Sequence, residues 1–237
     1  MIPLKDDIPS ETFPITTLGF IGANVAAFLY QLSLELSPEP GALRAAQEFV
    51  LEFGLIPCRL TAACRIPEAA PHPVVTILTS MFLHGGIFHL GGNMLYLYIF
   101  GNNVEDILGH GRFLLFYLLS GISAALAQVA VGPTSSVPMV GASSAVSGVL
   151  GAYLLLFPQA RVLILFTFFI FIRFIYVPAV IVLGFWIVLQ FLNGLITYSA
   201  ISAGREPGGV AWFAHIGGFV AGMVLLFVLR PRRRRRL

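Results

Sequence analysis

The segment VAWFAHIGGFVAGMVLLFVL, residues 210–229, is apolar over the roughly 20 residues that an α-helix needs to cross a lipid bilayer. It carries one ionisable side chain, that of His215, followed by glycines at 218 and 222. Ionisable groups at membrane depth are costly, so they usually mark a functional site. The segment therefore predicts a membrane-spanning helix and makes His215 a candidate functional residue.

The composition extends this prediction to the whole chain. Of its 237 residues, 57% are hydrophobic and only 11% are charged, and the mean hydropathy is +0.89. Such a chain has too much apolar surface for a soluble core, so we expect an all-α integral membrane protein. We expect six membrane-spanning helices, bounded by Gly, Pro or charged residues, at 15–34, 88–104, 113–131, 141–157, 177–197 and 210–229.

The apolar stretch 162–174 could be a seventh, short span or an interfacial segment, because it contains Arg173 and is followed by Pro178. Seven spans would place the two termini on opposite sides. Six spans gather Lys5, the loops of Arg112 and Arg161, and the arginine-rich end on one side. The positive-inside rule then predicts that both termini are cytoplasmic.

We therefore divide the chain into a cytoplasmic N-terminal segment (1–14), a six-helix membrane domain (15–230) and a basic cytoplasmic tail (231–237). The tail concentrates the basic residues: Arg230 and residues 232–236 supply six of the fourteen in the chain. The basic composition therefore indicates a tail that faces membrane lipids, and it does not indicate nucleic-acid binding. The compact six-helix form suggests a prokaryotic plasma membrane.

The long first outer loop, residues 35–83, is the one extended polar connection. Within it, residues 42–55 have apolar positions at helical spacing, which predicts a helix on the membrane surface. Cys58 and Cys64 lie in the same loop without the further ligands of a zinc site. A loop disulfide and two free thiols are both compatible with this spacing.

Two further polar patches interrupt the apolar segments: His89-x-x-x-Asn93 and Gly141-Ala142-Ser143-Ser144. In the predicted topology the second, fourth and sixth helices all begin on the outer side. His89, Ser143 and His215 each lie within about two turns of those starts, so we expect them at similar depths. Small residues at 147, 151, 218 and 222 would allow the fourth and sixth helices to approach closely.

These residue types fit the hydrolysis of a peptide bond. Ser143 would be the nucleophile and His215 the general base. The backbone N–H of Ser143, at a helix N-terminus, and the side chains of His89 and Asn93 would stabilise the oxyanion. Because the acidic residues lie in loops, tails or helix ends, we expect a Ser-His dyad without a carboxylate.

The same inventory disfavours other membrane activities. An aspartyl protease needs paired carboxylates within the membrane, and a zinc protease would be expected to carry an HExxH motif, which is absent. Proton-coupled transport would use buried Asp or Glu. We therefore expect no metal and no organic cofactor.

Five motifs together resemble the rhomboid family of intramembrane serine proteases, and the resemblance covers essentially the whole chain. They are Ile2-Pro3-Leu4 with Asp6-Asp7, Phe82-Leu83-His84-Gly85-Gly86 leading to His89-x-x-x-Asn93, Phe100-Gly101-x-Asn103-Val104-Glu105-Asp106, Gly141-Ala142-Ser143, and Ala214-His215-Ile216-Gly217-Gly218.

This resemblance implies a six-helix rhomboid core and gives Ser143, His215, His89 and Asn93 the roles stated above. It further implies a fifth helix that moves to admit substrates sideways from the lipid. The implied substrates are single-pass membrane proteins, cleaved near the outer membrane face.

The chain departs from the family pattern at two positions. Family members often carry GxSG at the nucleophile, whereas Ser144 takes the place of the second glycine here. Ser147 stands where some members place an aromatic residue beneath the catalytic histidine. The sequence does not show what orients the His215 imidazole. The alternative function is that of a non-catalytic rhomboid-like protein that binds membrane helices. Physiological substrate and oligomeric state are not predicted.

Overall fold

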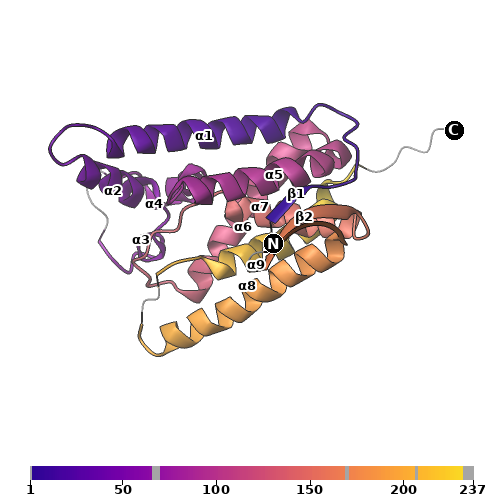
Figure 1. Ribbon diagram of the computed structural model, residues 1–237. Coiled ribbons are helices and arrows are strands. Elements are labelled where there is room, and N and C mark those ends of the chain that lie inside the picture. Colours follow the sequence, from indigo (N-terminus) through magenta and orange to yellow (C-terminus); the bar gives the residue numbers. More distant parts are fainter. Residues whose placement is uncertain (1, 66–69, 169–170, 206–207, 232–237) are drawn as a thin grey trace.

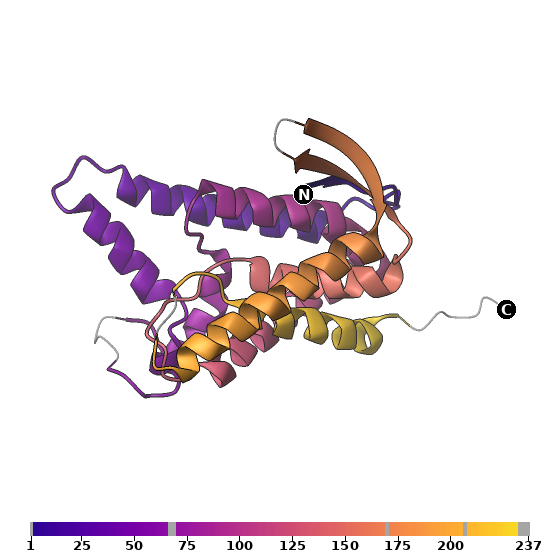
Figure 2. The ribbon, with the colours of Figure 1, turned by 60° about the horizontal axis from the view of Figure 1, so that its bottom comes forward.

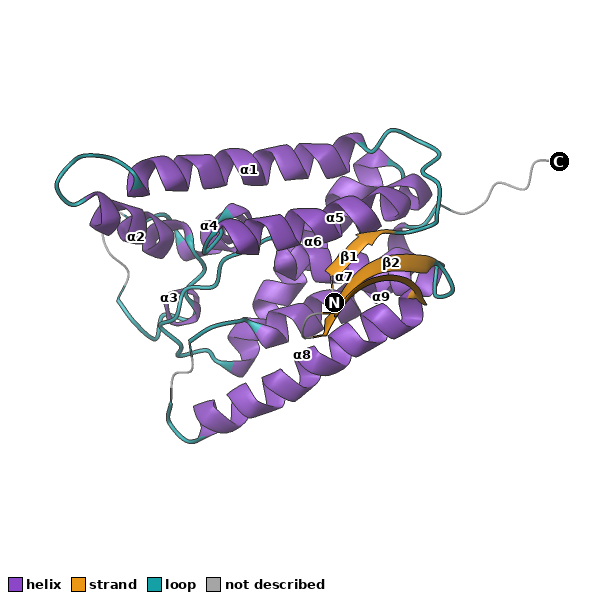
Figure 3. Cartoon of the chain, in the orientation of Figure 1, coloured by secondary structure: helices purple, strands orange, loops and turns teal. Residues whose placement is uncertain are grey.

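The computed structural model describes residues 2–65, 70–168, 171–205 and 208–231. Within them the protein is predominantly a bundle of long helices (Figures 1 and 3), which confirms the predicted fold class. Each of the six predicted spans corresponds to a helix. These helices are α1 (Ile15–Glu35), α5 (Ile87–Leu108), α6 (His110–Val131), α7 (Ser143–Leu156), α8 (Ala179–Ser202) and α9 (Trp212–Leu229).

The six helices differ in how far they could reach across a bilayer. In the described part of the chain, α1, α6, α8 and α9 are each long and apolar enough to cross alone. Helix α5 meets this test together with the preceding segment Pro73–Phe82, from which it is bent by 82°. Helix α7 has 14 residues, or about 21 Å, so it is shorter than the ~30 Å hydrocarbon core.

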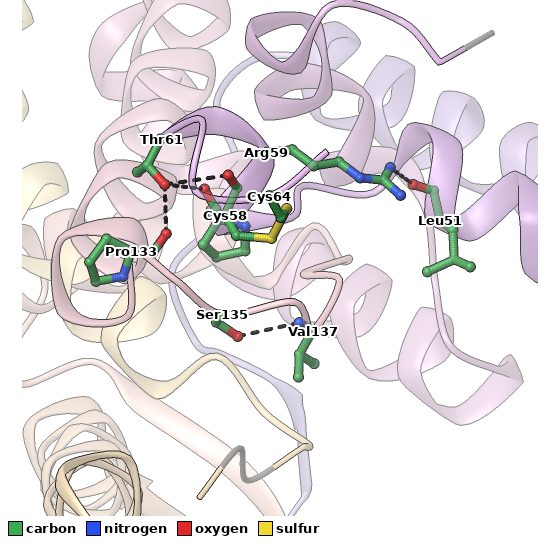
Figure 4. Close-up of a disulfide and its surroundings, with 9 residues drawn as sticks. Leu51, Cys58, Arg59, Thr61, Cys64, Pro133, Ser135 and Val137 are labelled. Carbon is green, nitrogen blue, oxygen red and sulfur yellow. Dashed lines mark hydrogen bonds between the residues drawn. A yellow bond between two sulfur atoms is a disulfide. The ribbon is translucent and has the colours of Figure 1, made fainter. Parts of the chain in front are cut away.

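The long loop between α1 and α5 contains short helices. The predicted surface helix is present as α2 (Ala42–Phe53), followed by α3 (Pro57–Leu60), α4 (Pro73–Thr79) and the 3₁₀ turn η1 (Ser80–Phe82). Cys58 and Cys64 form a disulfide, which decides between the two alternatives left by their spacing. Figure 4 shows that this disulfide lies next to residues of the loop that precedes α7.

The apolar stretch 162–174 is not a helix. The described residues on either side of 169–170 form two strands of an antiparallel sheet, β2 (Arg161–Phe168) and β3 (Phe171–Pro178), and β1 (Ile2–Lys5) pairs with β2. This sheet projects beside the start of α8 (Figure 2). Val162 and Ile164 are buried in the main core, as expected for alternate residues of a strand that covers helices. The chain is thus mostly helical, with one small sheet that we did not predict.

Helix α7 is the centre of the bundle. Ten of its 14 residues are buried, and it packs against α5, α6 and α9. A Cβ atom added at Gly218 or Gly222 of α9 would lie 2.2 Å or 2.1 Å from a backbone carbonyl oxygen of α7. The small residues therefore allow the two backbones to touch, as the sequence predicted.

Acidic residues tie α1 to the far end of α5. The Glu105 carboxylate accepts hydrogen bonds from the backbone N–H groups of Thr16 and Thr17, at 2.9 and 2.8 Å. The Asp106 carboxylate accepts from the N–H groups of Glu11 and Thr12. Because first-turn N–H groups lack partners within their own helix, these carboxylates act as caps for α1 and for the turn before it.

Candidate active site

The structure brings together Ser143, the first residue of α7, and His215, in the first turn of α9. The Ser143 Oγ lies 2.9 Å from the His215 Nε2, which is hydrogen-bonding distance. The close approach of α7 and α9 makes this contact possible across 72 residues of sequence. His215 is 9% exposed, so its imidazole is largely shielded from solvent.

A cavity of about 490 Å³ opens beside this pair. His89, Asn93, Ser143, Ser147 and His215 all contribute to its wall. The rest of the lining is largely apolar and includes Phe88 and Tyr96 of α5, Trp186 of α8, and Val140, Val146 and Leu150. Polar groups in a mostly apolar cavity are typical of a site that binds and orients a small part of a substrate.

His89 and Asn93 present hydrogen-bond donors to the cavity. The backbone N–H of Gly85 donates to His89 Nδ1 at 3.2 Å, so a neutral His89 carries its proton on Nε2. The Nδ2 group of Asn93 is buried and has no hydrogen-bond partner in the described structure. A buried donor without a partner is costly, which is a feature expected where a ligand atom completes the site.

The loop before α7 is held by backbone hydrogen bonds to the outer segment. Leu55 and Met139 exchange two of them, at 2.8 and 3.1 Å, and the Gly141 N–H donates to the Ser80 carbonyl at 2.9 Å. Gly141 has φ of 127°, which favours glycine, and a Cβ added there would lie 2.8 Å from His89 Nε2. Gly141 therefore gives His89 the space to face the cavity.

The disulfide loop also holds the segment that precedes α7. The Cys58 N–H donates to the Ser135 carbonyl at 3.0 Å, and the Thr61 hydroxyl donates to the Pro133 carbonyl at 2.7 Å (Figure 4). The outer loop thus fixes the approach to Ser143, a role that the sequence left unassigned.

The two serines that depart from the family pattern make no hydrogen bond to the imidazole in the described structure. Ser144 is buried at 4% exposure, and its carbonyl faces Gly218 of α9. The Ser147 hydroxyl donates to the Ser143 carbonyl at 2.6 Å, one turn back in its own helix. Ser143 is therefore the serine whose hydroxyl bonds to His215.

Two residues of α8 contact the His215 imidazole, and the sequence did not single them out. The Oε1 atom of Gln190 lies 2.8 Å from His215 Nδ1. The ring of Trp186 lies 5.8 Å from the imidazole, centroid to centroid. Gln190 is one of two amides in this apolar span, the other being Asn193, and both were a signal that could have been followed in the sequence, since polar groups at membrane depth need partners.

In the described part of the chain, no three His, Cys, Asp or Glu side chains gather as a metal site would require. The rings of His84 and His89 do lie 5.1 Å apart. The chemistry that the cavity offers is therefore that of a hydroxyl, an imidazole and hydrogen-bond donors.

The Rhomboid domain family model matches residues 71–232, which include the whole of this site. The chain belongs to the rhomboid family.

Several curated relatives support the assignment. The chain is 32% identical over 171 residues to "Rhomboid protein 1, mitochondrial" of Saccharomyces cerevisiae, covering 69% of this chain and 45% of that protein. It is 46% identical over 78 residues to "Rhomboid protease GluP" of Bacillus subtilis, covering 33% of this chain and 15% of that protein. It is 31% identical over 239 residues to "RHOMBOID-like protein 1" of Arabidopsis thaliana, covering 93% and 55%.

The chain thus spans about half or less of the length of these relatives. The assignment therefore extends to a multi-pass membrane protein with the rhomboid fold, and the reaction is argued below from the site.

Proposed function

We propose that this protein is an intramembrane serine endopeptidase that cleaves single-pass membrane proteins near the outer membrane face. The observation that carries the proposal is the 2.9 Å contact between Ser143 Oγ and His215 Nε2 at the wall of a cavity. A serine hydroxyl is a weak nucleophile until a neighbouring base removes its proton. The imidazole of His215 is in position to be that base.

The reaction proceeds in two stages. In the first, His215 Nε2 takes the Ser143 proton as Oγ attacks a peptide carbonyl, and the imidazolium then gives that proton to the leaving amine. In the second, His215 takes a proton from water, which attacks the acyl-enzyme. The Ser143 oxygen leaves and recovers a proton from His215, which releases the new carboxyl end and restores the dyad.

In this proposal three donors stabilise the developing oxyanion. They are the Nε2–H of His89, the Nδ2–H of Asn93 and the backbone N–H of Ser143 at the start of α7. The N-cap residue of α7 is Ala142, and the described structure has no side-chain cap there, which keeps the first N–H groups of α7 available for an anion. One oxyanion donor is typically worth about 10²- to 10³-fold in kcat.

The position of the cavity suggests how a substrate arrives. Its wall includes Phe88 of α5 and Trp186 of α8, so a chain from the lipid can reach Ser143 between these helices. A backbone in lipid stays hydrogen-bonded, so the substrate helix must unwind before attack. By the positive-inside rule both termini are cytoplasmic, with Ser143 toward the outer face of a prokaryotic plasma membrane.

The test is cleavage of a single-pass substrate in liposomes by the intact protein and by Ser143→Ala, His215→Ala and Ser144→Ala variants. Loss of cleavage in the first two variants, with retention in Ser144→Ala, supports the dyad. Ser144 is the matched control because it is the adjacent serine, whereas in the described structure the hydrogen bond to the imidazole comes from Ser143.

Labelling by a serine-directed fluorophosphonate gives an answer that does not depend on choosing the right substrate. The intact protein should be labelled at Ser143, and the Ser143→Ala variant should not. A folded intact protein that is neither labelled nor active on several substrates would favour the non-catalytic, helix-binding alternative.

A further inference from the structure

The side chain of Gln190 on α8 is buried, at 5% exposure, and makes two hydrogen bonds that fix its orientation. Its Nε2 group donates to the Trp186 carbonyl, one turn back, at 3.0 Å. A carbonyl can only accept, so the amide nitrogen must face Trp186 and the amide oxygen must face His215. The 2.8 Å contact with His215 Nδ1 is therefore made by Gln190 Oε1.

This orientation decides which imidazole nitrogen carries the proton. Because Oε1 can only accept, the Nδ1–H of His215 must donate to it. In the neutral imidazole, Nε2 then has a free lone pair, directed at the Ser143 hydroxyl 2.9 Å away. A general base needs that tautomer, and a base held in the other one could not take the serine proton.

We propose that Gln190 is the positioning residue of the Ser143–His215 dyad: it holds His215 in the Nδ1–H tautomer and in the orientation that lets Nε2 accept the serine proton. This inference deepens, and rests on, the proposed protease function. It supplies what the dyad lacks, since no carboxylate contacts Nδ1 in the described structure and Ser147 bonds to its own helix. Trp186 adds a ring beside the imidazole.

The position of Gln190 also links the base to the placement of α8. Only five of the 24 residues of α8 are buried, against ten of 14 in α7, so α8 is the more weakly packed helix. A displacement of α8 by about 1 Å would take the 2.8 Å contact beyond hydrogen-bonding range. The base is therefore fully oriented only while α8 lies against α9.

The first test compares Gln190→Leu with Asn193→Leu. Asn193 is the matched control: it is an amide on the same helix, and its Nδ2 donates to the Leu189 carbonyl at 2.8 Å. We expect Gln190→Leu to lower kcat by about 10²-fold with little change in KM, less than the roughly 10⁴-fold loss on altering a charged triad partner. Asn193→Leu should keep the kcat of the intact protein.

A second readout reports the tautomer directly. In the intact protein, ¹⁵N NMR of labelled histidine should show His215, assigned by its loss in His215→Ala, protonated at Nδ1. Gln190→Leu should lose that preference, and Gln190→Glu, which restores an acceptor for Nδ1–H, should recover both the tautomer and part of the activity. If Gln190→Leu does not fold, the unbranched Gln190→Met takes its place.

Two outcomes would overturn the proposal: an unchanged kcat in the folded variant, or a lower kcat with the Nδ1–H tautomer intact. The NMR readout needs no substrate, so it separates this failure from that of the proposed function. Failure of the proposed function would appear as an intact protein that is neither labelled nor active, or as cleavage or labelling that survives Ser143→Ala.

Discussion

Replacing Gly218 with alanine should separate α7 from α9 at the level of the Ser143–His215 pair. A Cβ atom at position 218 would lie 2.2 Å from the Ser144 carbonyl oxygen, and ordinary van der Waals contact begins at 3.4 Å. The carbonyl belongs to the backbone of a buried helix, so no side-chain rotation can relieve the overlap. The helices must therefore move apart locally by about 1.2 Å, the difference between these two distances.

The consequence for the dyad follows from its position. Ser143 precedes Ser144 directly, so the 2.9 Å contact between Oγ and Nε2 should lengthen to about 4 Å, too long for a hydrogen bond. Misplacing a catalytic group by about 1 Å can cost about 10²-fold in rate, or roughly 2.7 kcal/mol. We expect a loss of this size in both substrate cleavage and fluorophosphonate labelling.

Two matched substitutions separate positioning from stability. Gly184→Ala on α8 adds the same methyl group where no atom lies within 4 Å, so it should leave the labelling rate unchanged. Gly222→Ala meets the Gly148 carbonyl oxygen at 2.1 Å but lies about one turn further from the dyad than Gly218, so it should lower the melting temperature with a smaller loss of labelling. The reasoning would be refuted if Gly218→Ala were labelled as fast as Gly184→Ala.

Three further results are expected. His89→Ala should lower kcat by roughly 10²- to 10³-fold in the cleavage assay, and an unchanged kcat would remove His89 from the oxyanion site. Reducing the Cys58–Cys64 disulfide should lower the free energy of unfolding by about 2 kcal/mol, as measured by denaturant titration of the intact protein. A double Cys→Ala variant is the control, and reductant should not change its stability. Burial raises the pKa of the Asp6 carboxyl, so folding favours its protonated form. The stability that it contributes is greatest below about pH 4 and is lost as the pH rises through the raised pKa. As the pH rises through the raised pKa, the melting temperature of Asp6→Asn should therefore fall less than that of the intact protein. Equal slopes of melting temperature against pH would contradict this.

The sequence predicted the helices well because hydropathy and length dominate in a membrane. The predicted first span, 15–34, corresponds to α1 (Ile15–Glu35), and the last, 210–229, corresponds to α9 (Trp212–Leu229). The stretch 162–174 shows the limit of that signal, because a buried strand and a buried helix are both continuously apolar. What sets the strands here is pairing with β1, from the other end of the chain, which local periodicity does not contain.

Some features of the site and its surroundings could be predicted from local sequence, and others could not. Ser143, His215, His89 and Asn93 stood out because each is polar within an apolar segment and lies near a helix start. The disulfide did not, because a spacing of six residues allows a bond without requiring one.

Gln190 shows most clearly what only the fold supplies. Gln190 and Asn193 are both single amides on α8, three residues apart, and each donates to a carbonyl of its own helix one turn back. At 100° per residue they point about 60° apart, so one face of α8 decides between them. The packing of α8 on α9 puts Gln190 Oε1 against His215 and leaves Asn193 without such a contact in the described structure. Because both amides bond to their own helix and Gln190 alone of the two also contacts the base in the described structure, the comparison of Gln190→Leu with Asn193→Leu tests the fold's contribution to the chemistry directly.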